Sequence, residues 1–197
     1  MSLLTRIATP LSQWARSVLE PGSPPSAAPN SAFTLLDVEP YLSKRLSAEQ
    51  AAELVKPGNK VFVGTACATP RTLIRALESV RFTPPDVELI HFLTTDSIAH
   101  DGTGAPTTRY RHRCFFVGTD MREAVKRGLA EYLPVSIAAV PELFNIGRFP
   151  LDVAFIQCSP PDRFGYVSLG VSVDVVMAAV QKAGVLKLGF VTEPGGQ

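Results

Sequence analysis

A short loop of small residues is the first segment whose composition suits it to chemistry. It reads Gly64-Thr65-Ala66-Cys67-Ala68-Thr69-Pro70 and follows the apolar segment 61–63. Small side chains let a substrate approach the backbone, and free N–H groups at the start of a following helix stabilise an anion or an oxyanion. The loop contains neither the Gly-Lys-Ser/Thr of a phosphate-binding loop nor the GxGxxG of a dinucleotide-binding loop. A compact turn selected for packing is the alternative.

Cys67 is the candidate nucleophile within this loop. A nearby helix N-terminus lowers the pKa of a thiol, and a base would come from His91, His100 or His112. The spacing ties none of these histidines to Cys67, so we expect Cys67 to be a small buried residue. We expect His91 to lie in a strand with its ring hydrogen-bonded, and Cys158 to lie in the core. The histidines lack metal spacing such as HExxH, so no metal site is predicted.

A second candidate is the segment Gln157–Gly170, which reads Gln-Cys-Ser-Pro-Pro-Asp-Arg-Phe-Gly-Tyr-Val-Ser-Leu-Gly. It follows the apolar segment 151–156, which is typical of a buried strand. The two prolines forbid both a strand ladder and a helix, so a rigid loop is predicted. Loops at the ends of buried strands often hold ligands in α/β proteins. A tight connection without a ligand is equally compatible with the residues.

A loose group of cations lies between the two loops. Its members are Arg109, Arg111, Arg113, Arg122, Lys126 and Arg127. Such groups pair with the phosphates of a ligand, but a solvated protein face is the more common arrangement.

The elements that must position these residues alternate between strands and helices. Apolar runs predict strands at 61–63, 87–93, 114–117, 135–139, 151–156 and 185–191. Helical spacing predicts helices that begin near Ser47, Pro70, Asp120, Pro141 and Ser172. The apolar face of the helix that begins near Asp120 continues to Tyr132, so this helix is predicted to run that far. Ser47 and Gln50 form a capping box, and Thr69 is the expected cap of the second helix. The predicted fold class is therefore α/β, with a largely parallel sheet and flanking helices.

Composition sets further limits. The chain has 197 residues, of which 46% are hydrophobic and 19% charged, so a core can form. The net charge of +1 and the scattered cations argue against a nucleic-acid partner. No apolar run reaches the roughly 18 residues of a membrane span, so no membrane partner is expected. Three separate cysteines are typical of reduced thiols in a cytoplasmic protein.

The predicted organisation is an N-terminal extension and linker at 1–40 and one α/β domain at 41–197. Residues 1–19 carry two arginines, no acid and an apolar helical face, a pattern also found in organelle-targeting segments. We expect a plain N-terminal extension instead. Residues 21–30 are rich in Pro, Ser and Ala, which is typical of a linker.

Three ordered motifs resemble the acetyl-CoA hydrolase/transferase family, whose members are class I CoA-transferases such as 4-hydroxybutyrate/acetate CoA-transferases. The segment 64–70 is similar to the family's G-S-G-A-A-x-P loop, and 111–118 is similar to its R-H-x-x-F-F-V-G strand. The segment 157–170 matches its Q-x-S-P-P-D-x-x-G-Y-x-S-L-G signature, and 171–174 continues the match. The resemblance spans about residues 41–183 and covers the N-terminal domain of that family.

This resemblance implies an acyl-CoA hydrolase or an acyl-CoA:carboxylate CoA-transferase, with coenzyme A as substrate, no permanently bound cofactor, and a link to acetate metabolism. In that family a glutamate attacks the thioester, and a small carboxylate or water completes the turnover. The resemblance places the oxyanion and acyl-site loop at Gly64, Thr65, Ala66, Cys67 and Ala68. It places a wall of the site at Ser159, Pro160, Asp162 and Gly165.

The chain departs from the family in three respects. Ala66 replaces the second glycine of the loop, and the tail after Ala183 differs from the expected strand. The catalytic glutamate belongs to a second domain that we expect to be absent here, so no catalytic residue is assigned; Glu193 lies too early to take that role. The expected partners are a second domain or subunit, in a homo-oligomer when complete. The alternative is a non-catalytic domain that binds coenzyme A or a partner subunit.

Overall fold

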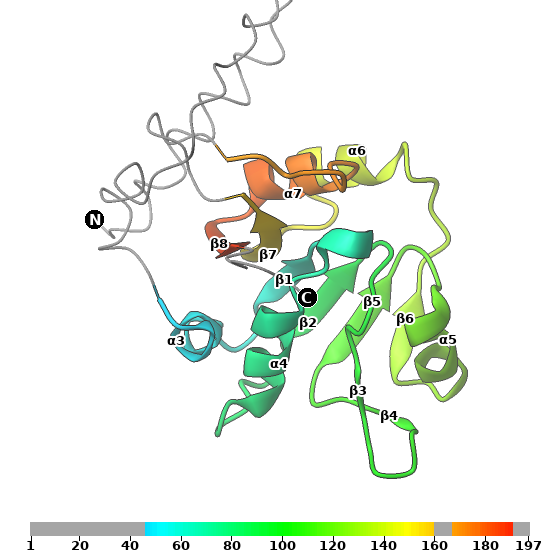
Figure 1. The fold of residues 1–197 in the computed structure, drawn as a ribbon. Coiled ribbons are helices and arrows are strands. Elements are labelled where there is room, and N and C mark those ends of the chain that lie inside the picture. The colour runs from blue at the N-terminus through cyan, green and yellow to red at the C-terminus, as the bar shows by residue number, and fades with distance from the viewer. Residues whose placement is uncertain (1–45, 160–166, 191–197) are drawn as a thin grey trace, which may run out of the picture.

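The computed structural model describes residues 46–159 and 167–190 (Figure 1). The predicted extension at 1–40 and Glu193 lie outside the described residues. Six parallel strands form one sheet in the order β6-β5-β2-β1-β7-β8, which confirms the predicted α/β class. The strands are β1 Lys60–Val63, β2 Glu88–His91, β5 Arg111–Cys114, β6 Ala130–Tyr132, β7 Val153–Cys158 and β8 Val185–Phe190. A separate antiparallel hairpin consists of β3 Ala99–His100 and β4 Pro106–Thr107.

Helices connect the strands and flank the sheet. They are α3 Ala48–Glu53, the 3-10 helix η2 Ala66–Ala68, α4 Arg71–Ser79, α5 Thr119–Lys126, α6 Val140–Asn145 and α7 Val176–Lys182. The capping box is confirmed, because the Ser47 and Gln50 side chains each accept the other's backbone N–H. Within the two described stretches, each helix is too short or too polar to cross a bilayer.

Alternate residues of the central strand serve two separate cores. Val61 and Val63 pack with helices α3 and α4 on one face of the sheet. Phe62, between them, packs with α6 and α7 on the other face and meets the Phe144 ring edge-on at 5.8 Å. All three β1 side chains are at most 1% exposed. A strand buried on both faces reads as a continuous apolar run, which is why the sequence identified β1 and β7.

The order of the strands creates one switch point in the sheet. From β1 the chain moves outward through β2 and β5 to β6, and then returns past β1 to β7 and β8. Consecutive connections therefore leave the neighbouring strands β1 and β7 towards opposite faces (Figure 1). The crevice at the carboxyl ends of such a strand pair is where open α/β sheets bind ligands. The loops that follow β1 and β7 are the two candidate loops of the sequence.

Several sequence predictions about element positions were wrong. The strand predicted at 114–117 lies at 111–114. The prediction missed it because charged and buried residues alternate there and do not form an apolar run. The segment 135–139 is not a strand, and Ile137 is 47% exposed. The helix predicted to run to Tyr132 ends before Gly128, whose φ of +71° stops it, and β6 follows. The final helix begins at Val176 rather than near Ser172.

Candidate functional site

The two candidate loops meet at the switch point between β1 and β7. The Thr65 hydroxyl, which is fully buried, donates to Asp174 Oδ2 at 2.5 Å. The Cys67 thiol lies 3.3 Å from the Ser172 hydroxyl. These two side-chain contacts join segments more than 100 residues apart in the sequence, with separations of 109 and 105 residues. The loop after β1 and the segment that continues the loop after β7 therefore form one surface.

The second loop leaves and returns through a closed neck. The Ser159 N–H donates to the Ser168 carbonyl at 2.8 Å, and the Ser168 N–H donates to Ser159 Oγ at 2.8 Å. Val167 and Leu169 are buried in the core beside this neck. The predicted wall residues Pro160, Asp162 and Gly165 lie outside the described residues, so their role stays a prediction. Ser159 lies at the neck itself.

Gly64 is required by a close backbone approach. Its N–H donates to the Phe155 carbonyl at 2.8 Å, which extends the pairing of β1 with β7. A Cβ at this position would lie 3.1 Å from the Ala68 carbonyl oxygen and 3.4 Å from backbone atoms of Phe155 and Ile156. Backbone atoms cannot move aside as a side chain does. Glycine therefore lets the loop turn tightly over the end of β7.

Ala66 occupies a backbone conformation that favours glycine. Its φ is +50°, in the left-handed region where a Cβ is strained. This position is one of the departures from the family motif, which has glycine here. The departure thus carries backbone strain in addition to the added methyl group. Thr69 holds the end of the same loop, because its hydroxyl donates to the Ala66 carbonyl at 2.7 Å and accepts the Thr95 N–H at 3.1 Å. Thr69 does not cap α4 as predicted, and Pro70 stands at that position instead.

The backbone N–H groups of the loop differ in availability. The Ala66 N–H donates to the Leu93 carbonyl at 2.7 Å, and the Ala68 N–H donates to the Thr65 carbonyl at 3.0 Å. The Cys67 N–H has no hydrogen-bond partner among residues 46–159 and 167–190. Of the three N–H groups at 66–68, the one at Cys67 is therefore the one that no described residue engages.

Cys67 is exposed, so the prediction of a buried residue was wrong. Its thiol contacts Ser172 and not a histidine. Both ring nitrogens of His91 and of His112 are engaged elsewhere, and His100 lies in the hairpin strand β3. The geometry gives no support to a Cys–His pair. Cys158 is buried in the core, as predicted, and burial raises the pKa of its thiol to about 12.

The histidines of β2 and β5 form a buried pair that the sequence did not indicate. His91 Nε2 lies 2.9 Å from His112 Nδ1, and His91 Nδ1 lies 3.1 Å from the Thr94 hydroxyl. The prediction of a hydrogen-bonded strand histidine at 91 is confirmed. Burial lowers the pKa of His91 to about 4. Burial, and secondarily the neighbouring His91, lowers the pKa of His112 well below its usual value. Both rings are therefore neutral at pH 7.

The predicted cation group binds mainly to the protein itself. Arg109 donates to the carbonyls of Glu78 and Val80, and Arg113 pairs with Glu88 and Glu131 at 3.0 and 2.7 Å. These contacts support a structural role for the group over a phosphate site. Within the described residues no cluster of three or more His, Cys, Asp or Glu side chains is arranged to hold a metal ion.

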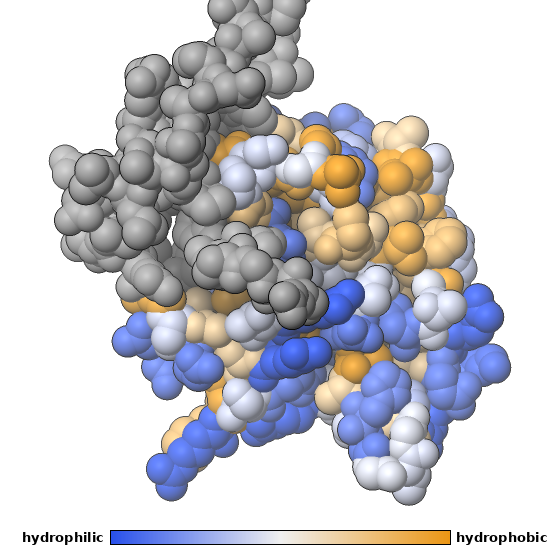
Figure 2. Space-filling model, viewed as in Figure 1, coloured by the Kyte–Doolittle hydropathy of each residue, from blue (hydrophilic) through white to orange (hydrophobic). Residues whose placement is uncertain are grey.

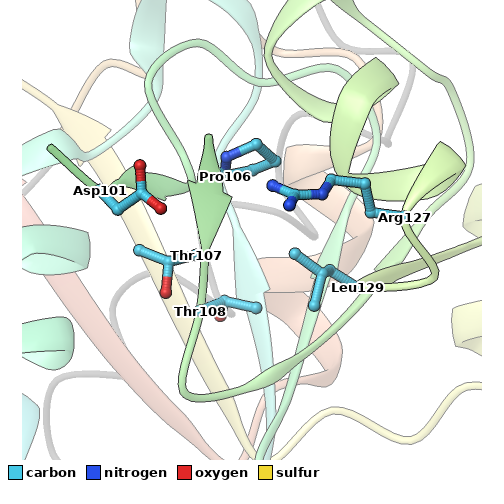
Figure 3. Close-up of a pocket in the computed structure, with 6 residues that line it drawn as sticks. All are labelled: Asp101, Pro106, Thr107, Thr108, Arg127 and Leu129. Carbon is cyan, nitrogen blue, oxygen red and sulfur yellow. The ribbon is translucent and has the colours of Figure 1, made fainter. Parts of the chain in front are cut away.

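A separate hollow lies at the amino edge of the sheet (Figure 3). It has a volume of about 370 Å³ and lies between the β3–β4 hairpin and the end of α5. The Arg127 side chain extends towards Pro106 across it. Its lining residues are Asp101, Pro106, Thr107, Thr108, Arg127 and Leu129. Because parallel strands run from this edge towards the other, the hollow is distinct from the two candidate loops.

The sequence matches known proteins over most of its length. A family model described as the acetyl-CoA hydrolase/transferase N-terminal domain matches residues 35–186. The 4-hydroxybutyrate coenzyme A transferase of Clostridium kluyveri is 34% identical over 145 residues, which cover 74% of this chain and 34% of that protein. The succinyl-CoA:acetate/propanoyl-CoA:succinate CoA transferase of Fasciola hepatica is 34% identical over 140 residues, which cover 70% of this chain and 28% of that protein. The chain thus spans about a third of the length of these relatives.

Solved structures show the same fold. The 4-hydroxybutyrate CoA-transferase of Porphyromonas gingivalis superposes with a TM-score of 0.52 and 28% identity, over 77% of this chain and 34% of that one. RipA from Yersinia pestis superposes with a TM-score of 0.66 and 21% identity, over 78% of this chain and 38% of that chain. At that identity the second likeness concerns the fold alone.

The strain at Ala66 predicts opposite effects for two neighbouring glycine substitutions. Ala66→Gly should raise the free energy of unfolding by about 0.5–1 kcal/mol, because relief of a left-handed alanine exceeds the added chain entropy. The matched change Ala68→Gly should lower it by about 0.5–1 kcal/mol, since it adds entropy without relieving strain. Urea unfolding of both variants tests this expectation. A loss of stability in both would show that Ala66 is not strained.

The buried histidine pair predicts acid sensitivity. Unfolded histidine binds a proton below a pH of about 6.5, whereas the folded rings stay neutral until much lower pH. The unfolded state then binds more protons, so stability should fall as the pH drops from 6.5 to 5, by about 1.5 kcal/mol per histidine. Urea unfolding across this range checks the slope. His112→Gln should make the slope shallower and His100→Gln should not; equal slopes in all three proteins would contradict the assignment.

Proposed function

The chain belongs to the acetyl-CoA hydrolase/transferase family by its match to the N-terminal domain, and we propose that it forms one side of an acyl-CoA site. The complete protein would be an acyl-CoA:carboxylate CoA-transferase or an acyl-CoA hydrolase. The observation that carries this proposal is the junction of the two motif loops. The contacts of Thr65 with Asp174 and of Cys67 with Ser172 join them at the sheet's switch point, and the Cys67 N–H has no partner in the part of the chain that the structure describes.

The proposed role of the first loop is to bind the thioester carbonyl. A carbonyl oxygen that gains negative charge during attack is stabilised by an N–H group 2.7–3.1 Å away. The N–H groups of Ala66 and Ala68 already serve Leu93 and Thr65, so this role narrows to Cys67. Gly64 and Thr65 shape the loop, and the exposed position of Cys67 gives a ligand access to its backbone.

The nucleophile is proposed to come from outside the described residues. Asp174 is the carboxylate that contacts the loop, but both of its oxygens are engaged. Oδ2 accepts the Thr65 hydroxyl, and Oδ1 accepts the N–H groups of Val175 and Val176. A glutamate of a second domain or subunit would attack the thioester carbon. The carbon–sulfur bond then breaks, coenzyme A leaves as its thiolate, and a small carboxylate or water takes the acyl group.

Exposed apolar side chains follow the carboxyl ends of the strands, where a second domain or subunit is proposed to dock. Figure 2 shows apolar residues gathered over α6 and its surroundings, whereas the opposite end of the same view is mainly polar. Exposed apolar side chains in the segments after β5, β6 and β7, between 43% and 87% exposed, are Phe116, Ile137, Val171 and Val173. Apolar patches of this kind mark interaction sites, which supports a homo-oligomeric or two-domain complete protein.

A non-catalytic domain that binds coenzyme A or a partner subunit is the second proposal. It is favoured by the engagement of Asp174, because the loop then lacks a free carboxylate of its own. Both proposals use the same binding site, but only the first predicts that the complete protein turns over acyl-CoA. A cytoplasmic location stays a prediction from the cysteine content.

The binding site predicts that this chain binds coenzyme A without turning over acetyl-CoA. Gly64→Ala should weaken binding about tenfold, because the added methyl group pushes the loop away from the end of β7. Gly102→Ala is the matched control, since a Cβ there meets no atom within 4 Å. Calorimetric titration with coenzyme A, alongside thermal unfolding of each variant, measures both effects.

Three outcomes would contradict this account. Absence of binding by the wild-type chain would overturn the proposed site. An equal loss in Gly64→Ala and Gly102→Ala would remove the loop from it. Robust acetyl-CoA turnover by this chain, lost in Glu193→Ala, would show that the nucleophile lies in the tail and not in a second domain.

A further inference from the structure

A file of polar side chains passes through the interior from the hollow at the amino edge to the loops at the carboxyl edge. Successive polar atoms along it lie between 2.7 and 3.1 Å apart. Four of its members are at most 4% exposed. In order, the members of this polar file are Thr108, His112, His91, Thr94, Ser97 and Asp120.

The hydroxyl protons at one end of the polar file fix its direction. Three short contacts must each hold a proton: His91 Nδ1 to Thr94 at 3.1 Å, Thr94 to Ser97 at 2.7 Å, and Ser97 to Asp120 Oδ2 at 2.8 Å. Thr94 and Ser97 own one hydroxyl proton each. Asp120 lies in the first turn of α5, where the helix dipole stabilises a carboxylate, which only accepts. Thr94 also lies 3.2 Å from Asp120 Oδ2, but its single proton is assigned to the shorter 2.7 Å contact with Ser97. The third proton then comes from His91 Nδ1.

This count determines the tautomer of both histidines. A neutral His91 with its proton on Nδ1 has a bare Nε2, which must accept from His112 Nδ1 at 2.9 Å. His112 Nε2 is then bare and accepts the Thr108 hydroxyl proton at 2.7 Å. That contact is shorter than the alternatives open to Thr108, which are 3.2 Å to the Tyr110 carbonyl and 3.3 Å to Glu78. Each ring nitrogen and each hydroxyl proton of the file is thereby assigned to one contact, whereas Asp120 Oδ1 has no partner among the described residues.

The polar file ends in the segment that holds the candidate site loop. Residues 93–97 follow β2 and include two members of the file. The Leu93 carbonyl accepts the Ala66 N–H at 2.7 Å, and the Thr95 N–H donates to the Thr69 hydroxyl at 3.1 Å. Ala66 and Thr69 flank Cys67, so the position of segment 93–97 sets the direction of the Cys67 N–H.

We infer that His91, His112 and Thr94 are positioning residues: both rings are held in the Nδ1–H tautomer, and the directed hydrogen bonds fix segment 93–97 so that the Cys67 N–H faces the ligand. The inference rests on the proposed function for the identity of its ligand, whereas its geometry rests on the distances along the polar file. It assigns a task at the site to two buried histidines that do not reach it.

The tautomers are tested first on the unliganded protein. Long-range proton–nitrogen NMR of the imidazole rings at pH 7 distinguishes a protonated Nδ1 from a protonated Nε2. Both His91 and His112 should show a protonated Nδ1 and a bare Nε2. A protonated Nε2 in either ring would reverse the direction of the file and overturn the inference.

The positioning role is tested by a matched pair of substitutions at Thr94. Thr94→Val keeps the shape but removes the hydroxyl that joins His91 to Ser97, whereas Thr94→Ser restores it. In Thr94→Val the backbone amide resonances of Ala66 and Cys67 should shift, and the affinity for coenzyme A should fall about 2- to 10-fold, the equivalent of one hydrogen bond. Thr94→Ser should retain the wild-type resonances and affinity.

A purely structural role predicts a different pattern. Thr94→Val would then lower the unfolding free energy while the Ala66 and Cys67 amides keep their positions, and that result would overturn the inference. If the wild-type chain does not bind coenzyme A, the proposed function fails on its own. The tautomers and the amide shifts still decide the positioning role in that case.

Discussion

The hydrogen bond from the buried Thr65 hydroxyl to Asp174 is the interaction on which the candidate site depends. It joins the loop after β1 to the segment that leads from β7 into α7. The connections that follow β1 and β7 leave these strands towards opposite faces of the sheet. Without this contact the two loops would be separate turns at one edge. Asp174 also accepts the N–H groups of Val175, which precedes α7, and of Val176, its first residue, so one carboxylate contacts both the loop and the start of a helix.

This constraint explains why the loop residues are so small. A Cβ on Gly64 would lie 3.1–3.4 Å from neighbouring backbone atoms, and two residues later Ala66 adopts a left-handed conformation. The strain at Ala66 persists because its N–H is held by Leu93 and its carbonyl by Thr69. In the proposed site, this preorganisation would orient the Cys67 N–H before a ligand arrives, and such preorganised donors are the source of electrostatic stabilisation of a developing oxyanion.

The sequence predicted the α/β class and the two loops because both depend on local pattern. Apolar runs mark strands buried on both faces, and prolines and small residues mark the loops. It did not predict the contact of His91 with His112, because that contact requires the register in which β2 lies beside β5. The end of α5 was misplaced although Gly128 signals it, since helical spacing continued past the glycine. The left-handed backbone of Ala66 was not predicted either, because an alanine in the sequence does not indicate that conformation.

The central claim, that the loops after β1 and β7 form one ligand site, is tested most directly by amide chemical-shift mapping with coenzyme A. The account predicts that resonances of residues 64–69 and 167–175 shift together with the same apparent affinity, while those lining the hollow at Thr107, Arg127 and Leu129 do not. Shifts confined to the hollow, or to one of the two loops, would contradict it.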